Sequence, residues 1–141
     1  MATQPEYWMR GPVENIPALL QPVAHALLQA KQEVNELMQD FPENLLWLQP
    51  AGLASPAFHL AHLTGVLSRL FTYAKAEQLS QDQLDALQAE GKEDAGKNIA
   101  LLLELFNRQV NLSLEQLAGI DVKTLTDFRG VGRKQLPSTV L

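Results

Sequence analysis

Three histidines are the side chains of this 141-residue chain best suited to hold a metal ion. His59 and His62 stand three residues apart in an apolar stretch, so on a helix both imidazoles would share one face. Neutral imidazole is a common ligand of zinc, nickel and iron. We therefore take His59 and His62 as candidate metal ligands. His25 falls opposite the apolar side of its own segment, and we expect it at the surface.

Two histidines do not complete a metal site. Zinc usually has three protein ligands in catalytic sites and four in structural sites, and the chain has no cysteine to supply the rest. In an alternative interpretation, His59 is a core histidine bonded to a backbone carbonyl and His62 is its half-exposed neighbour. The spacing alone favours this alternative, because two histidines three apart are not specific for metal.

Other residues give weaker signals. Arg69 and Tyr73 flank the histidine face and could bind an anion, although a surface ion pair and a partly buried phenol are the simpler interpretation. The run 129–134 contains two glycines and three cations but matches no phosphate-loop spacing, so we expect a turn with solvated charges. No serine or threonine stands in a nucleophile motif.

The apolar periodicity predicts long helices on which these residues lie. Helical spacing extends over 15–41, with a kink or a restart at Pro22. A second helix should begin at Ser55-Pro56 and run to about residue 77. A short helix with a capping box should follow from Ser80 to Gly91, and a last long helix should end at Gly119.

The remaining segments connect these helices. We expect 42–56 to be an ordered connection that packs Trp47 back on the bundle. In the tail, Gly130, Gly132 and Pro137 indicate turns, and residues 138–141 look like a cap followed by the start of another helix.

These elements predict one all-α domain over 1–141, an up-and-down helical bundle whose last helix is missing. Three long helices would leave one side open. We expect an exposed apolar stripe that a fourth helix or a partner chain covers, and therefore self-association. The stripe would consist of Leu63, Leu70, Leu103, Phe106 and Val110.

Charge and hydropathy exclude several kinds of partner. The net charge is -5, so no positive field is available for nucleic acid. No apolar run approaches the roughly 18 residues of a membrane span, and the first ten residues contain no signal region. A cytoplasmic protein is the expectation.

Three stretches of the sequence carry a family resemblance. The helix around the histidines, the short helix after it and the tail together resemble the DinB-like family of metal-binding four-helix bundles. The residues that carry the resemblance are Ser55-Pro-Ala-Phe-His-Leu-Ala-His-Leu-Thr-Gly65 with Arg69-Leu-Phe-Thr-Tyr-Ala74, Leu79-Ser-Gln-Asp-Gln-Leu84, and Arg129-Gly-Val-Gly-Arg-Lys-Gln-Leu-Pro-Ser-Thr-Val140.

The resemblance implies a function as well as a fold. It implies a homodimer and a divalent metal held by one histidine of the second helix and two histidines of the last helix. His62 matches that ligand, and His59 matches a histidine of one subset of the family. No counterpart of the last helix stands in this sequence, so we expect an incomplete metal site.

Two functions follow as expectations. The first is a metal-dependent enzyme of the hydrolase or thiol-dependent transferase type, acting on a small molecule or a low-molecular-weight thiol. The second is a non-catalytic helical module that self-associates through its open apolar face.

Overall fold

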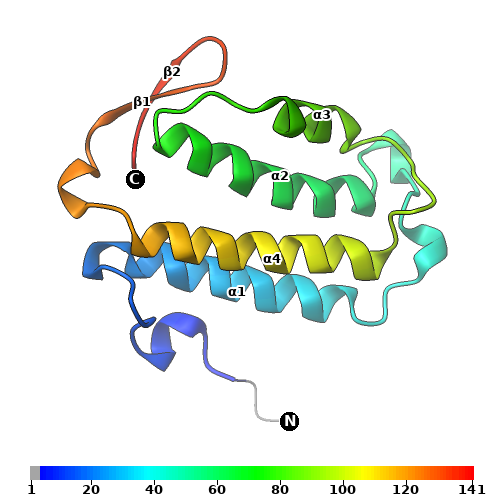
Figure 1. The fold of residues 1–141 in the computed structure, drawn as a ribbon. Helices are drawn as coiled ribbons and strands as arrows, with labels where there is room; N and C mark the ends of the chain where they lie inside the picture. The colour runs from blue at the N-terminus through cyan, green and yellow to red at the C-terminus, as the bar shows by residue number, and fades with distance from the viewer. Residues whose placement is uncertain (1–3) are drawn as a thin grey trace.

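The computed structural model describes residues 4–141 as a helical bundle with a small hairpin at its end (Figure 1). Successive helices alternate in direction, as an up-and-down bundle requires, and the predicted all-α class is confirmed. The helices are α1 Gln21–Met38, α2 Pro56–Ala74, α3 Gln81–Ala89 and α4 Ile99–Ala118, and the strands are β1 Phe128–Val131 and β2 Leu136–Thr139. Short 3-10 turns occupy Tyr7–Arg10, Ala18–Leu20, Glu43–Leu45, Pro50–Gly52 and Val122–Thr124.

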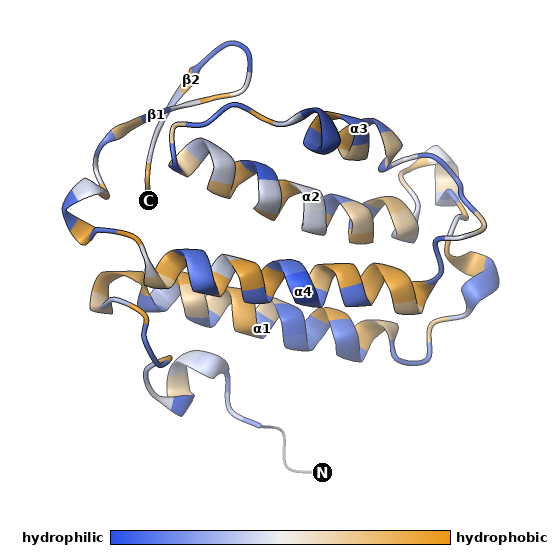
Figure 2. Cartoon of the chain, in the orientation of Figure 1, coloured by the Kyte–Doolittle hydropathy of each residue, from blue (hydrophilic) through white to orange (hydrophobic). Residues whose placement is uncertain are grey.

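Helix α4 is the centre of the bundle, because it packs against both α1 and α2. Its ribbon is largely hydrophobic in Figure 2, whereas α3 is mostly hydrophilic and lies on the outside of α2. The buried core forms two clusters, one toward each end of the bundle. They consist of Met38, Leu46, Ala57, Leu60, Ile99 and Leu102 at one end, and of Leu20, Ala24, Leu117 and Leu125 at the other.

Capping side chains and prolines mark the starts of the helices. The Ser55 hydroxyl accepts a hydrogen bond from the Phe58 amide, so it caps α2. The predicted capping box at the start of α3 is present. Pro22 lies in the first turn of α1, where its missing N–H costs nothing, so the helix starts there and is not kinked. The preceding residues 18–20 form a separate 3-10 turn.

The connection 42–55 is ordered, as predicted. Leu46 belongs to the buried core and Trp47 packs against the same cluster. The Glu43 carboxylate accepts the Ile99 amide at 3.1 Å and so ties this connection to the first turn of α4. None of the helices within residues 4–141 is long and apolar enough to cross a membrane.

The prediction of a helix start at residues 138–141 is wrong. Residues 136–139 are strand β2, paired antiparallel with β1 so that Phe128 faces Thr139 and Val131 faces Leu136. Gly132 and Gln135 have positive φ and make the turn. Pro137 also favours extended backbone at the residue before it, which suits a strand. The Val140 and Leu141 amides then bond to the carbonyls of Asp127 and Leu125, so the pairing continues.

The predicted apolar stripe is only partly exposed. Phe106 is 2% exposed and Val110 is buried, because α4 lies between α1 and α2 rather than at an open side. Leu70, by contrast, is 48% exposed. The exposed apolar surface faces outward between α1 and α2, where Leu37 and Leu53 border a hollow of about 460 Å³.

Candidate functional site

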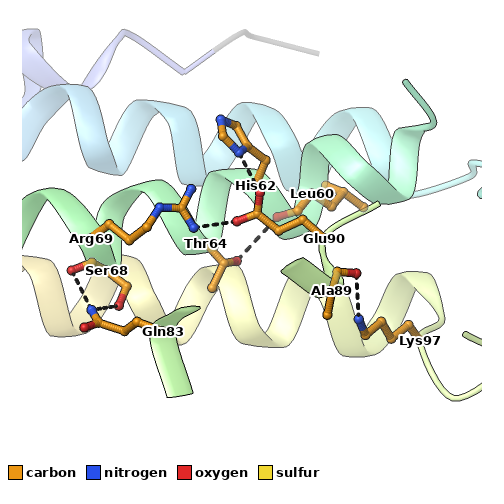
Figure 3. A network of polar contacts seen from close by, with 9 residues as sticks. All are labelled: Leu60, His62, Thr64, Ser68, Arg69, Gln83, Ala89, Glu90 and Lys97. Carbon is orange, nitrogen blue, oxygen red and sulfur yellow. Dashed lines mark hydrogen bonds and ion pairs between the residues drawn. The ribbon is translucent and has the colours of Figure 1, made fainter. Parts of the chain in front are cut away.

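His62 faces the end of α3, where Glu90 is the first residue beyond the helix. The Nδ1 atom of His62 lies 2.8 Å from Oε2 of Glu90 (Figure 3). A carboxylate accepts hydrogen bonds, so the hydrogen belongs on Nδ1 and the lone pair of Nε2 stays available. The His62 side chain is 43% exposed and that of Glu90 only 5%, so a surface imidazole is hydrogen-bonded to a buried carboxylate.

Arg69 binds the other oxygen of the same carboxylate. Arg69 Nη1 donates to Glu90 Oε1 at 2.6 Å, and the arginine side chain is 10% exposed. Arg69 follows His62 by two helical turns, so both residues reach Glu90 from one side of α2. The expectation of a surface ion pair at Arg69 is wrong, because α3 covers the pair and buries it.

Gly65 leaves the space that this arrangement needs. It lies between His62 and Arg69 on α2, and a Cβ atom there would collide with Glu90 Oε1 and Arg69 Nη1. A larger residue at this position would therefore separate the carboxylate from the guanidinium.

Helix α3 is fixed on α2 mainly by Gln83. Its Oε1 accepts the Ser80 amide, while Nε2 donates to the carbonyl and hydroxyl of Ser68 and to the Thr72 hydroxyl. At the other end of α3, Lys97 Nζ donates to the Ala89 carbonyl at 3.4 Å (Figure 3). These contacts hold both ends of α3, and Glu90 is placed as a consequence.

An aromatic ring fixes the plane of the His62 imidazole. Phe58 stacks on it at a centroid distance of 5.3 Å and an interplanar angle of 11°. The same ring meets His59 edge to face at 5.4 Å. His62 is therefore held by a hydrogen bond at Nδ1 and by a stacking contact on one face.

The other two histidines lie elsewhere. His59 is exposed on the wall of the hollow between α1 and α2, so the interpretation of a core histidine is wrong. His62 is half-exposed, as that interpretation expected. His25 is partly buried, with Nε2 2.9 Å from the Gly11 carbonyl oxygen, and takes no part in the site.

Residues 4–141 contain no group of three or more histidine, cysteine or acidic side chains placed to hold a metal ion. The carboxylate nearest to His62 is engaged by two partners on α2. The described part of the chain thus offers His62 as one oriented imidazole, with His59 three residues before it.

The sequence reasoning missed Glu90. One signal was present, since Gly65 and Arg69 follow His62 on the face that α3 covers. A glycine and a cation on one helical face indicate space and charge for an acidic partner. Which acid fills the space depends on the docking of α3, and a single sequence does not contain that information.

One family model matches most of the chain. It is the model of the DinB superfamily, and it covers residues 26–138. The matched span runs from α1 into β2 and includes His59, His62 and Glu90. Neither the curated proteins nor the solved structures gave a significant match.

Proposed function

The chain belongs to the DinB superfamily, and on that basis we propose that it is a divalent-metal protein in which His62 is a metal ligand. The observation that carries the proposal is the contact of His62 Nδ1 with Glu90, which leaves Nε2 free. Histidines that bind metals usually give their other N–H to a carboxylate or carbonyl, which fixes the tautomer and makes the ligand more basic. His59 is the second candidate ligand.

The reaction types that we propose are those that a divalent metal ion can promote. A bound zinc, nickel or iron ion supplies polarisation of a carbonyl or activation of a thiol or water, as hydrolases and thiol-dependent transferases require. Glu90 orients the His62 ring, and Arg69 compensates the buried charge of that carboxylate. Phe58 covers one face of the imidazole. The substrate class we propose is a small molecule or a low-molecular-weight thiol.

Cobalt titration of the 15N-labelled 141-residue chain tests the proposal. We expect weak binding, because the described residues offer at most two imidazoles. Paramagnetic broadening should centre on the amides around His62. The His62→Ala variant should lose this broadening, whereas His25→Ala, a matched loss of one imidazole outside the site, should keep it. Broadening centred on residue 25, or none at millimolar cobalt, would contradict the proposal.

The same titration separates the two histidines of α2. We expect His59→Ala to weaken cobalt binding less than His62→Ala does, because His59 lacks a carboxylate support in the described residues. If His59→Ala abolishes binding while His62→Ala retains it, His59 is the ligand and His62 is not.

A second candidate function is a helical module that forms homodimers. The observation that favours it is the exposed apolar surface between α1 and α2, bordered by Leu37 and Leu53. Contiguous apolar surface of this kind is rare on monomers. His59 lies on the same surface, so a second copy docked there would come close to the histidines of α2.

Analytical ultracentrifugation tests the dimer. We expect Leu37→Glu, on the wall of this hollow, to produce monomers, and Leu87→Glu to leave the dimer intact because Leu87 is an exposed leucine on α3, away from the hollow. A monomeric wild-type chain at high concentration would contradict self-association. A dimer combined with no cobalt effect on α2 would favour the module over the metal protein.

A further inference from the structure

A second cleft, of about 680 Å³, is lined by residues of the β1–β2 hairpin, the end of α2, the loop that leads into α3 and the first turn of α3. Figure 1 shows the hairpin beside the end of α2. The polar side chains of its walls are Tyr73, Glu77, Gln78, Arg129, Arg133 and Gln135. None of the three residues of the His62–Glu90–Arg69 cluster lines it. The cleft is therefore separate from the candidate metal site.

Arg129 lines this cleft and is anchored by two backbone carbonyls. Its Nε donates to the Ala74 carbonyl at the last residue of α2, at 2.6 Å, and Nη1 donates to the Phe128 carbonyl at 2.8 Å. Within residues 4–141, Nη2 of Arg129 has no hydrogen-bond partner. A guanidinium anchored at Nε and Nη1 keeps the N–H groups of Nη2 for a ligand, which makes it a preorganised donor for an anion.

Further donors face the same space. Arg133 stands in the hairpin turn, is exposed, and makes no ion pair with any described residue. The Tyr73 phenol, also in the lining, is likewise without a hydrogen-bond partner in the described chain. Glu77 is the one acidic residue among the lining, against two arginines. The cleft is therefore locally cationic on a chain whose net charge is -5.

The remaining wall is apolar. Phe128 is strongly exposed at the edge of the cleft, and Leu79 and Leu84 line the side formed by the loop and α3. A pocket with an apolar wall and a few converging donors suits a small organic molecule with one charged end.

We propose that this cleft binds a small organic anion, a carboxylate or a phosphate monoester with an apolar body. The anionic group lies between Arg129 and Arg133, and the body packs on Phe128 and Leu79. Binding at this cleft does not depend on a metal at His62, since the two sites share no lining residue.

Titration of the 15N-labelled chain with phenyl phosphate and with benzoate tests the proposal, with benzyl alcohol as the uncharged analogue. We expect saturable shifts at residues 73–79 and 128–135 with one or both anions and none with benzyl alcohol. Phenyl phosphate alone would identify phosphate as the anionic group, and benzoate alone would identify carboxylate. Inorganic phosphate should bind at least about tenfold more weakly than phenyl phosphate if the apolar wall contributes.

Two matched variants identify the cation. Arg133→Gln should weaken binding of the anion about tenfold, because it removes a charge-assisted contact. Lys134→Gln changes the net charge equally in the same turn but lies outside the lining, and it should leave binding unchanged. Equal weakening by both variants would show attraction by net charge alone. That result, or the absence of saturable binding by either anion, overturns the proposal.

Discussion

His62 and Glu90 meet through a 2.8 Å contact between Nδ1 and Oε2, although 28 positions separate them in the chain. Helix α3, which carries the chain to Glu90, has no buried residue of its own. Glu90 is nevertheless among the few buried charged residues. The docking of this short helix on α2 thus places the Glu90 carboxylate against His62 and Arg69.

Removal of that carboxylate should destabilise the fold. Glu90→Ala leaves Arg69 buried without a partner, and breaking a buried ion pair from one side costs about 3 kcal/mol. Thermal unfolding should therefore shift down by roughly 10 °C. Glu93→Ala, an exposed acid in the following linker, is the control and should shift the midpoint little. An unchanged midpoint for Glu90→Ala would show that the pair contributes nothing to stability.

Replacing both residues of the Arg69–Glu90 ion pair should lower the free energy of unfolding by less than the sum of the two single replacements. Glu90→Leu leaves the Arg69 charge buried without a partner, and Arg69→Met leaves the buried Glu90 carboxylate with His62 as its one partner, whereas the double variant contains neither buried charge. We expect a coupling free energy of about 2 kcal/mol from urea unfolding of the four proteins. Additive losses would mean that the two side chains do not act as a unit.

Much of the fold could be predicted from the sequence because its signals are local. The caps at Ser55 and Ser80, the restart of the helix at Pro22 and the apolar periodicity of α4 each depend on neighbouring residues, and the structure contains all of them. Residues 138–141 show the limit of such signals. A serine before apolar residues favours a helix start locally, but pairing with β1 decides the conformation.

The candidate site was less predictable because its partners are far apart in sequence. His62 was identified as a candidate from its spacing to His59 and from a family resemblance, and its half-exposed position agrees with the sequence-based expectation. Glu90 and the burial of Arg69 depend on how α3 docks on α2. An arginine on a helical face looks like a solvated residue until the covering element is known.

Gly65 provides a test in which two effects have opposite signs. Alanine is favoured over glycine in a helix by about 1 kcal/mol, so propensity alone predicts that Gly65→Ala is stabilising. The added Cβ would lie 2.5 Å from Arg69 Nη1 and closer still to Glu90 Oε1. We expect the collision to win, with a net loss of about 1–2 kcal/mol in chemical denaturation.

The control for this test is Gly91→Ala. Its Cβ would meet only Phe58 Cδ2, at an ordinary 3.7 Å, so the variant should be nearly neutral. A stabilised Gly65→Ala protein would show that Arg69 and Glu90 can move apart without cost.

Gln83 allows the docking of α3 to be separated from its formation. Gln83→Glu keeps the acceptor of the capping box and adds a negative charge to the first turn, so the isolated helix should be at least as stable. On α2, however, the new carboxylate would face the Ser68 carbonyl with no hydrogen to donate. We expect the folded protein to lose about 1–2 kcal/mol, with faster hydrogen exchange of the α3 amides. Gln88→Glu adds the same charge to an exposed position in the last turn of the same helix, where the helix dipole opposes it, and should cost at most about 0.5 kcal/mol. Slower exchange in the Gln83→Glu protein would mean that capping, and not the contact with α2, holds the helix that positions Glu90.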